Sequence, residues 1–201
     1  MSLIELKDRV MGIPWVYDTV RPLVVGYIDH QALARFCAVV PTDRVFDLGC
    51  GTAQLFPYLK CQRYLGVDLD AHALQRARRY AGQSARFMQG DSWDNAYREL
   101  DPTVVLMMGL VHHISDEDFR SVVCRLKSGA ESLRKIVTFD TSYFPGSIVN
   151  NLLSRLDRGK YVRKPPAYEA LFTQSGLRVT RKEILSTRLR YARYIGYHLE
   201  I

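Results

Sequence analysis

The fold is decided by residues 45–53, which read Val-Phe-Asp-Leu-Gly-Cys-Gly-Thr-Ala. An apolar run that ends in an acid predicts a buried strand, and the two glycines after it let the backbone turn sharply and approach a ligand. A strand, a glycine turn and a helix in this order place a small molecule at the carboxyl end of a central strand in an open α/β sheet. The next question is which molecule binds there.

Two phosphate-binding patterns are missing from the chain. A dinucleotide site has the pattern G-x-G-x-x-G, but Gln54 stands where the third glycine would be. A Walker loop ends in Gly-Lys followed by Ser or Thr, whereas Gly159-Lys160 is followed by Tyr161. The sequence therefore disfavours a dinucleotide and the simplest NTPase.

The turn resembles motif I of the class I S-adenosylmethionine-dependent methyltransferases, in which an acid precedes three alternating glycines. Here Asp47, Gly49 and Gly51 match, and Ala53 replaces the third glycine, a mild departure that is tolerable if Ala53 has helical dihedral angles. The resemblance implies S-adenosyl-L-methionine as cofactor and S-adenosyl-L-homocysteine as product. It also implies that Gly49, Cys50 and Gly51 lie against the methionine part, which Asp47 either anchors through the turn or water or faces at its ammonium group.

A second strand over 63–68 ends in Asp68. A carboxylate there can accept two hydrogen bonds from the vicinal hydroxyls of a ribose. The family resemblance assigns this role to Asp68, followed by Leu69 in the binding loop. Asp70 is the rival, but it fits better as the N-cap of a helix over 71–81.

A third unit repeats the arrangement, with a strand over 85–89 followed by Asp91 and Ser92. The resemblance places an acid here within reach of the adenine amino group. The alternative is that Asp91 and Ser92 only turn the chain.

The loop after the fourth strand, 103–108, contains His112 and His113. Its Leu-Val-His-His-Ile stretch looks like the small-molecule branch of the family, and the Asn/Asp-Pro-Pro-aromatic stretch usual in nucleobase amino methyltransferases is missing. Either histidine is a candidate general base for a substrate hydroxyl, since imidazole titrates near neutral pH. Packing is the alternative role, and we expect no metal because the histidines and cysteines have no metal-ligand spacing.

The remaining pattern predicts a Rossmann-like α/β fold: an open, mostly parallel sheet of about seven strands, helices on both faces and a C-terminal antiparallel hairpin. We expect a helical lid segment over 1–40, in which Tyr17 contacts substrate. The methyltransferase domain is expected over 41–201, with an acceptor-side insertion over 141–165. The other elements expected are a helix over 31–40 capped by Asp29, a short helix over 54–60, a helix from Ser115 to Gly129, a strand over 136–139, a helix opened by Pro165-Pro166, and strands over 177–185 and 190–201.

The positive charge of the chain is concentrated near its end. Residues 1–150 contain 17 basic and 17 acidic residues, whereas residues 151–201 contain 11 basic and 4 acidic ones. This favours an anionic small acceptor (a sugar, lipid or secondary metabolite, methylated on oxygen or nitrogen), and the candidate contacts are Tyr143, Arg158, Tyr161 and Arg163. A solvated basic face is the alternative for these residues.

Two other functions stay open at this stage. One is an RNA or DNA methyltransferase, which the basic charge favours, and the other is a non-catalytic binder of an adenosyl ligand. The chain has no transmembrane run, and its four cysteines follow no pattern, so we expect a cytoplasmic protein.

Overall fold

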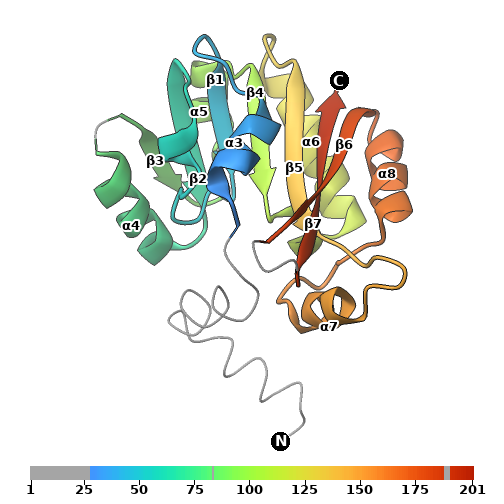
Figure 1. Cartoon of the computed structure of the whole chain (residues 1–201). Coiled ribbons are helices and arrows are strands. Elements are labelled where there is room, and N and C mark those ends of the chain that lie inside the picture. The colour runs from blue at the N-terminus through green and yellow to red at the C-terminus, as the bar shows by residue number, and fades with distance from the viewer. Residues whose placement is uncertain (1–27, 83, 188–190) are drawn as a thin grey trace, which may run out of the picture.

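The computed structural model describes residues 28–82, 84–187 and 191–201. Within these residues, seven strands form one sheet in the order β3-β2-β1-β4-β5-β7-β6 (Figure 1). Strands β1 to β5 are parallel, and β7 runs antiparallel to both β5 and β6. The strands are β1 Arg44–Leu48, β2 Arg63–Asp68, β3 Arg86–Gln89, β4 Val104–Met108, β5 Lys135–Thr141, β6 Arg178–Ser186 and β7 Arg193–Glu200. The predicted fold class, including the terminal antiparallel hairpin, is confirmed.

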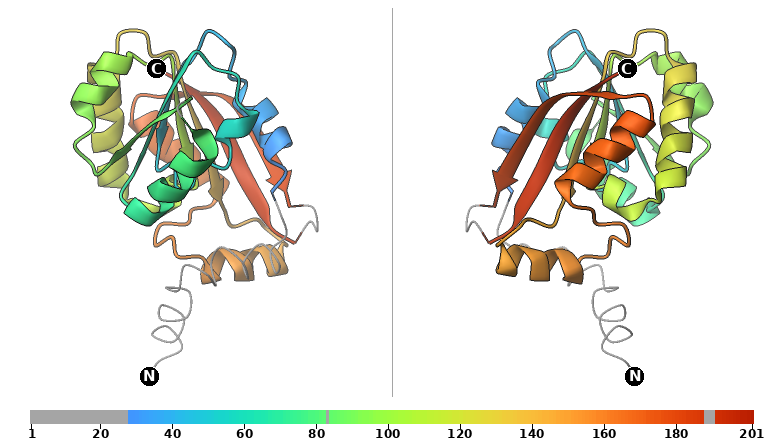
Figure 2. Two further views of the ribbon diagram at one scale, coloured as in Figure 1. Left: turned by 90° about the vertical axis from the view of Figure 1, so that its left-hand side faces the viewer. Right: turned by 90° about the vertical axis from the view of Figure 1, so that its right-hand side faces the viewer.

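Helices cover both faces of the sheet (Figures 1 and 2). On one face, α3 contributes Leu33, Phe36 and Cys37 to a core with Val45, Val104 and Val137. On the other face, α5, α6 and α8 pack over a larger core that includes Phe46, Tyr97, Phe119 and Phe172. The helices are α3 His30–Cys37, α4 Ala71–Ala81, α5 Asp94–Leu100, α6 Asp116–Gly129, α7 Ile148–Leu156 and α8 Pro165–Gln174, with short 3-10 turns η2 Phe56–Tyr58 and η3 Val111–His113.

The helix starts predicted at Asp29, Asp70 and Ser115 agree with the structure, because each of these side chains accepts a hydrogen bond from the first turn of its helix. The Asp29 carboxylate accepts from Ala32 at the start of α3, and Asp70 accepts from His72 and Ala73 at the start of α4. Ser115 accepts from the Asp118 backbone at the start of α6. These caps stabilise helix starts by satisfying amide donors that have no partner within the helix.

The predicted elements differ from the described structure in two respects. The expected helix over 54–60 is reduced to the η2 turn, and helices α5 and α7 had not been predicted. Helix α3, which belongs to the expected lid segment 1–40, packs on the sheet core, and the lid role of that segment stays a prediction. Residues 1–27, with Tyr17, lie outside the described residues.

The carboxyl ends of the parallel strands meet at one edge of the sheet. In Figure 1 this edge is at the bottom, and α7 (orange) lies beyond it. The candidate site is therefore bounded by the loops after β1, β2, β3 and β4 and by the segment 142–164 that follows β5.

Candidate active site

The glycine turn after β1 is held against the end of β2. The backbone amides of Gly49 and Cys50 both donate to the carbonyl of Val67, at 2.8 and 3.0 Å. Gly49 and Gly51 adopt positive φ angles of 75° and 53°, which glycine accepts without a Cβ penalty. The turn is therefore a fixed feature of the fold.

Ala53 does not meet the condition under which alanine is tolerable in place of the third glycine. It has a φ of 53°, so it lies in the left-handed region and not in the helical region. The left-handed conformation costs an alanine about 1–2 kcal/mol. This position is one where the glycine of the family pattern would be the unstrained residue.

Asp68 joins β2 to the glycine turn. Its Oδ2 accepts from the Gly51 amide at 2.7 Å and its Oδ1 from the Asp70 amide at 2.9 Å. An ionised carboxylate has about four acceptor sites, so both oxygens retain capacity for hydroxyl donors. Leu69, the next residue, is 72% exposed, which leaves an aliphatic side chain in water at the edge of the same site.

Open space lies over the glycines at this edge. A Cβ atom added to Gly51 or to Gly90 would meet no further atom of the described residues within 4 Å. Gly90 follows β3 directly and also has a positive φ, of 105°. The backbone at the ends of β1 and β3 is thus accessible, and the donor and acceptor set around it fits the methionine, ribose and adenine parts of an adenosyl cofactor.

Asp47 does not point into this space. It is 3% exposed, and its Oδ2 accepts a 2.5 Å hydrogen bond from the Tyr64 hydroxyl. Burial raises the pKa of Asp47 to about 7; the Tyr64 hydrogen bond opposes this shift and the nearby charge of Asp68 adds to it. Direct contact between the Asp47 carboxylate and a cofactor ammonium group is therefore not supported, which leaves the alternative of anchoring through the turn.

Cys50 has a packing role. A Cβ atom at Gly66 would lie 2.8 Å from the Cys50 Sγ, so the sulfur occupies the space beside the glycine of β2. Burial raises the pKa of the Cys50 thiol, which keeps it protonated and unreactive.

The loop after β3 presents Asp91 and Ser92 to solvent, while Trp93 turns inward. Trp93 is 2% exposed and packs in the larger core. Arg125 stacks over its ring at 4.0 Å and donates to the carbonyl of Asp91 at 2.9 Å. Arg125 thereby fixes the backbone of the loop and leaves the exposed side chains of Asp91 and Ser92 at its surface.

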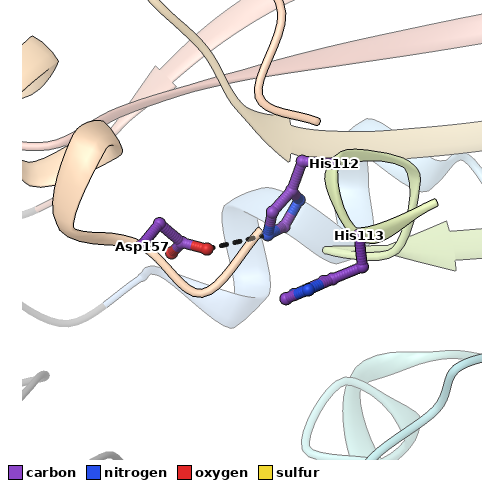
Figure 3. Close-up of side chains that lie close together, drawn as sticks. All are labelled: His112, His113 and Asp157. Carbon is purple, nitrogen blue, oxygen red and sulfur yellow. Dashed lines mark ion pairs between the residues drawn. The ribbon is translucent and has the colours of Figure 1, made fainter. Parts of the chain in front are cut away.

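The two histidines of the loop after β4 lie in different environments, although their rings are 4.2 Å apart (Figure 3). His112 is buried, and its Nδ1 lies 2.7 Å from Asp140 Oδ1 while its Nε2 lies 3.2 Å from Asp157 Oδ1. His113 is exposed. The loop begins beside the glycine turn, since a Cβ at Gly49 would lie 3.1 Å from Leu110 Cδ1.

The two carboxylates keep His112 protonated at neutral pH. Burial by itself lowers the pKa of His112, but the hydrogen bonds and charges of Asp140 and Asp157 outweigh it and raise the pKa to about 9. Both ring nitrogens then donate, and the imidazolium has no lone pair with which to accept a proton. In this state His112 cannot act as a general base.

The ligand atoms of His112, His113 and Asp157 lie within 4.8 Å of one another. A metal requires a neutral imidazole, whereas His112 is held as a cation by two acids. We therefore interpret His112 and Asp157 as a buried ion pair that lies beside the exposed His113.

The segment after α7 fits closely over His112. A Cβ atom at Gly159 would lie 2.2 Å from His112 Cδ2, and the Tyr161 amide donates to the His112 carbonyl at 2.9 Å. Asp157 also accepts from the Gly159 amide at 2.9 Å. Asp157 thus closes the loop 157–161 and connects it to His112.

Arg163, which we expected to contact substrate, forms hydrogen bonds within the protein. It donates to the carbonyls of Val111 and Ile114 and to the carboxylate of Asp116. Its side chain is 10% exposed, so it stabilises the end of the η3 turn. Arg158 and Tyr161 are exposed, and Tyr143 is half-buried.

Two site residues were not identified from the sequence, Asp140 and Asp157. Asp140 directly follows the strand predicted over 136–139. The structure places it inside β5, 2% exposed, with its Oδ2 unpartnered within the described residues. The available signal was its position, because it follows the acids of β1, β2 and β3 at the same edge of the sheet. Asp157 carries no such signal.

Residues 45–129 match the family model of a methyltransferase domain. Indolepyruvate C-methyltransferase of Streptomyces griseus is 28% identical to the chain over 126 residues, which cover 57% of this chain and 38% of that protein. The chain therefore spans about two fifths of the length of this curated relative.

Solved structures show the same fold. A methyltransferase from Aquifex aeolicus described as S-adenosylmethionine-dependent superposes with a TM-score of 0.66 at 14% identity, covering 97% of this chain and 98% of that one. A methyltransferase of calicheamicin biosynthesis, solved with bound S-adenosylhomocysteine, gives a TM-score of 0.68 at 18% identity and covers 97% of this chain and 60% of that one. Among the described helices, none combines the length and apolar character needed to span a bilayer.

Proposed function

We propose that this protein is a class I methyltransferase that transfers a methyl group from S-adenosylmethionine to a small anionic acceptor; the match of residues 45–129 to a methyltransferase domain supports this. The observation that carries the proposal is the 2.7 Å hydrogen bond between the Gly51 amide and Asp68. It brings the glycine turn and the ribose-type carboxylate together beneath open space, at the end of two adjacent parallel strands.

The residues that we assign to the cofactor follow from this arrangement. The backbone of Gly49 and Gly51 would hold the methionine part, and Asp68 the ribose hydroxyls. The exposed aliphatic side chain of Leu69 would cover one face of the adenine, with Asp91 and Ser92 at its polar edge. The cofactor supplies a methyl group already activated by a positively charged sulfur.

The protein must then position the acceptor and accept its proton. We assign proton acceptance to His113, which is exposed beside the site and lies next to a fixed cation. We assign positioning to His112, because its two ion pairs set the shape of the loop that bears His113. If the loop 157–161 opened and Asp157 left His112, His112 would itself become the alternative base.

The anionic character of the acceptor is supported by exposed cations on the same side of the site. Arg158 and Lys160 are exposed residues of the loop 157–161 that closes over His112, and Tyr161 of the same loop is 41% exposed. Sugars, lipids and secondary metabolites with a carboxylate or phosphate, methylated on oxygen or nitrogen, are the acceptor class we propose. The four free cysteines support a cytoplasmic location.

The assignment of Asp68 to the ribose hydroxyls is tested by measuring the affinity for S-adenosylhomocysteine by calorimetry. Asp68→Ala is expected to weaken binding about 10- to 150-fold, since hydrogen bonds to a charged group contribute about 1.5–3 kcal/mol. Asp70→Ser is the matched control, because it removes the neighbouring acid and retains an oxygen for the α4 cap. Equal affinity of wild type and folded Asp68→Ala would contradict the assignment.

Methyl transfer is tested with labelled cofactor against a panel of acidic metabolites, lipids and RNA. Transfer to RNA alone would replace the small-molecule acceptor, and cofactor binding without transfer to any acceptor would favour a non-catalytic binder. With an acceptor in hand, His113→Gln should lower kcat about 100-fold or more at neutral pH without changing cofactor affinity. A kcat unaltered in His113→Gln but lost in His112→Gln would reassign the base to His112.

A further inference from the structure

Helix α7 is attached to the protein by its polar side chains. Asn150 donates to the Ser142 carbonyl at 2.8 Å and accepts from the Arg193 amide at 2.7 Å. Ser154 lies 2.9 Å from the Thr141 hydroxyl. Asn150 and Ser154 are each 3% exposed, so the inward side of the helix is largely polar.

The outward side of α7 is apolar. Ile148 is 83% exposed, Val149 54%, Leu152 57% and Leu156 45%. At about 100° per residue these four positions fall within an arc of about 100° on one side of the helix. A surface helix normally buries its apolar side, and a contiguous exposed apolar patch marks an interaction surface.

Within the segment 141–164, which contains α7, all the exposed charge is positive. In the segment 141–164 the only acid is Asp157, and it is buried against His112. The exposed charged residues of the segment are Arg155, Arg158, Lys160 and Lys164. A two-fold contact between copies of this face would bring like charges together, because such a contact is self-complementary. A partner with an apolar interior and an anionic surface complements both features.

We infer that α7 docks this protein on an anionic lipid surface. Ile148, Val149, Leu152 and Leu156 enter the boundary between headgroups and acyl chains, and the four cations lie at the phosphate level. This is the arrangement of an interfacial amphipathic helix, whose binding depends on buried apolar area and on attraction to anionic lipid. A helix of nine residues gives weak, reversible binding.

Helix α7 lies on the same side of the molecule as the candidate active site. Figures 1 and 2 place α7 beyond the edge of the sheet where the parallel strands end, and the loop that follows it closes over His112. A protein docked through α7 therefore turns its candidate active site toward the lipid surface. The inference itself does not depend on methyl transfer.

Vesicle co-sedimentation tests the inference on the full chain. Wild type is expected to bind vesicles of phosphatidylcholine with phosphatidylglycerol, and to bind pure phosphatidylcholine vesicles more weakly. The double variant Ile148→Ser/Leu152→Ser is expected to lower the partition coefficient on anionic vesicles about tenfold or more. Val40→Ser is the matched control, because Val40 is a 46% exposed aliphatic residue near the start of β1, at the other end of the sheet, and it should bind as wild type does.

Equal binding of the double variant and wild type, or no binding of wild type to anionic vesicles, would overturn the inference. Sedimentation equilibrium provides the second measurement. If wild type is a dimer and the double variant a monomer, the face is a contact between copies and lipid docking is wrong. Circular dichroism shows that the double variant is folded, which it should be because neither replaced side chain is buried.

Discussion

The ion pairs of His112 make a quantitative prediction about stability and pH. The pKa of His112 is raised from 6.5 to about 9 in the folded protein. At about 1.36 kcal/mol per pKa unit, this difference corresponds to about 3 kcal/mol of folding free energy. The folded state binds the proton more tightly, so the stabilisation is fully present below pH 6.5 and is lost as the pH rises through about 9. Three kcal/mol is a large share of the total stability of a domain, which is about 5–15 kcal/mol.

Urea denaturation at several pH values between about 6 and 9.5 measures this contribution. The free energy of unfolding of wild type minus that of His112→Gln should be about 3 kcal/mol larger at the acid end than at the alkaline end. Asp157→Asn should shift the loss of stability to lower pH, because one of the two charges that hold the proton is gone. His72→Gln, at an exposed histidine of α4, controls for removal of a histidine. A difference between wild type and His112→Gln that does not change with pH would show that His112 is neutral in the folded protein and would refute the reasoning.

Two further predictions concern the surroundings of the site. Gly159→Ala should destabilise the protein by about 1–3 kcal/mol, because its Cβ would lie 2.2 Å from the His112 ring and 2.6 Å from the His112 carbonyl oxygen; a wild-type melting temperature would contradict this packing. Asp47 is expected to change the stability with pH in the direction opposite to that of an acid in an ion pair. Its pKa is raised from 3.8 to about 7 by burial, so the folded state binds the proton more tightly and stability falls as the pH rises from about 4 to 7. Asp47→Asn should lack this fall in urea denaturation, and an identical pH profile for wild type and variant would count against a buried, protonated Asp47.

The positions in the fold of the residues that we assign to the cofactor were largely predictable from the sequence. The acids at the ends of β1, β2 and β3 and the caps at Asp29, Asp70 and Ser115 act over one or two turns of backbone, so each leaves a local signal. The side-chain directions were less predictable. Asp47 and Asp68 end neighbouring strands, yet Asp47 is buried against Tyr64 and Asp68 reaches the glycine turn. That difference depends on packing between strands, which a linear pattern does not contain.

The acceptor half was less predictable for two physical reasons. Helix α7 buries its polar residues Asn150 and Ser154 and exposes its aliphatic residues. The spacing of its apolar residues therefore does not indicate a helix that packs on the core. The ion pairs of His112 join residues that are distant in sequence, Asp140 and Asp157. The separation of Asp140 and Asp157 from His112 along the sequence does not indicate that these residues form ion pairs. The signal that exists is chemical: a buried histidine in this loop needs an acceptor for each N–H.

The exposed aliphatic residues of α7 are not explained by the stability of the fold. The hydrogen bonds of Asn150 and Ser154 hold the helix to the body, and Leu153 supplies its apolar contact with the core. Ile148 and Leu152 point away from the body, so their replacement by serine should change the free energy of unfolding by only about 0.5 kcal/mol each. Water disfavours these side chains and the fold does not use them. Their grouping on one side of α7, in a segment whose exposed charges are all positive, fits an anionic lipid surface, which satisfies both the apolar and the charged residues.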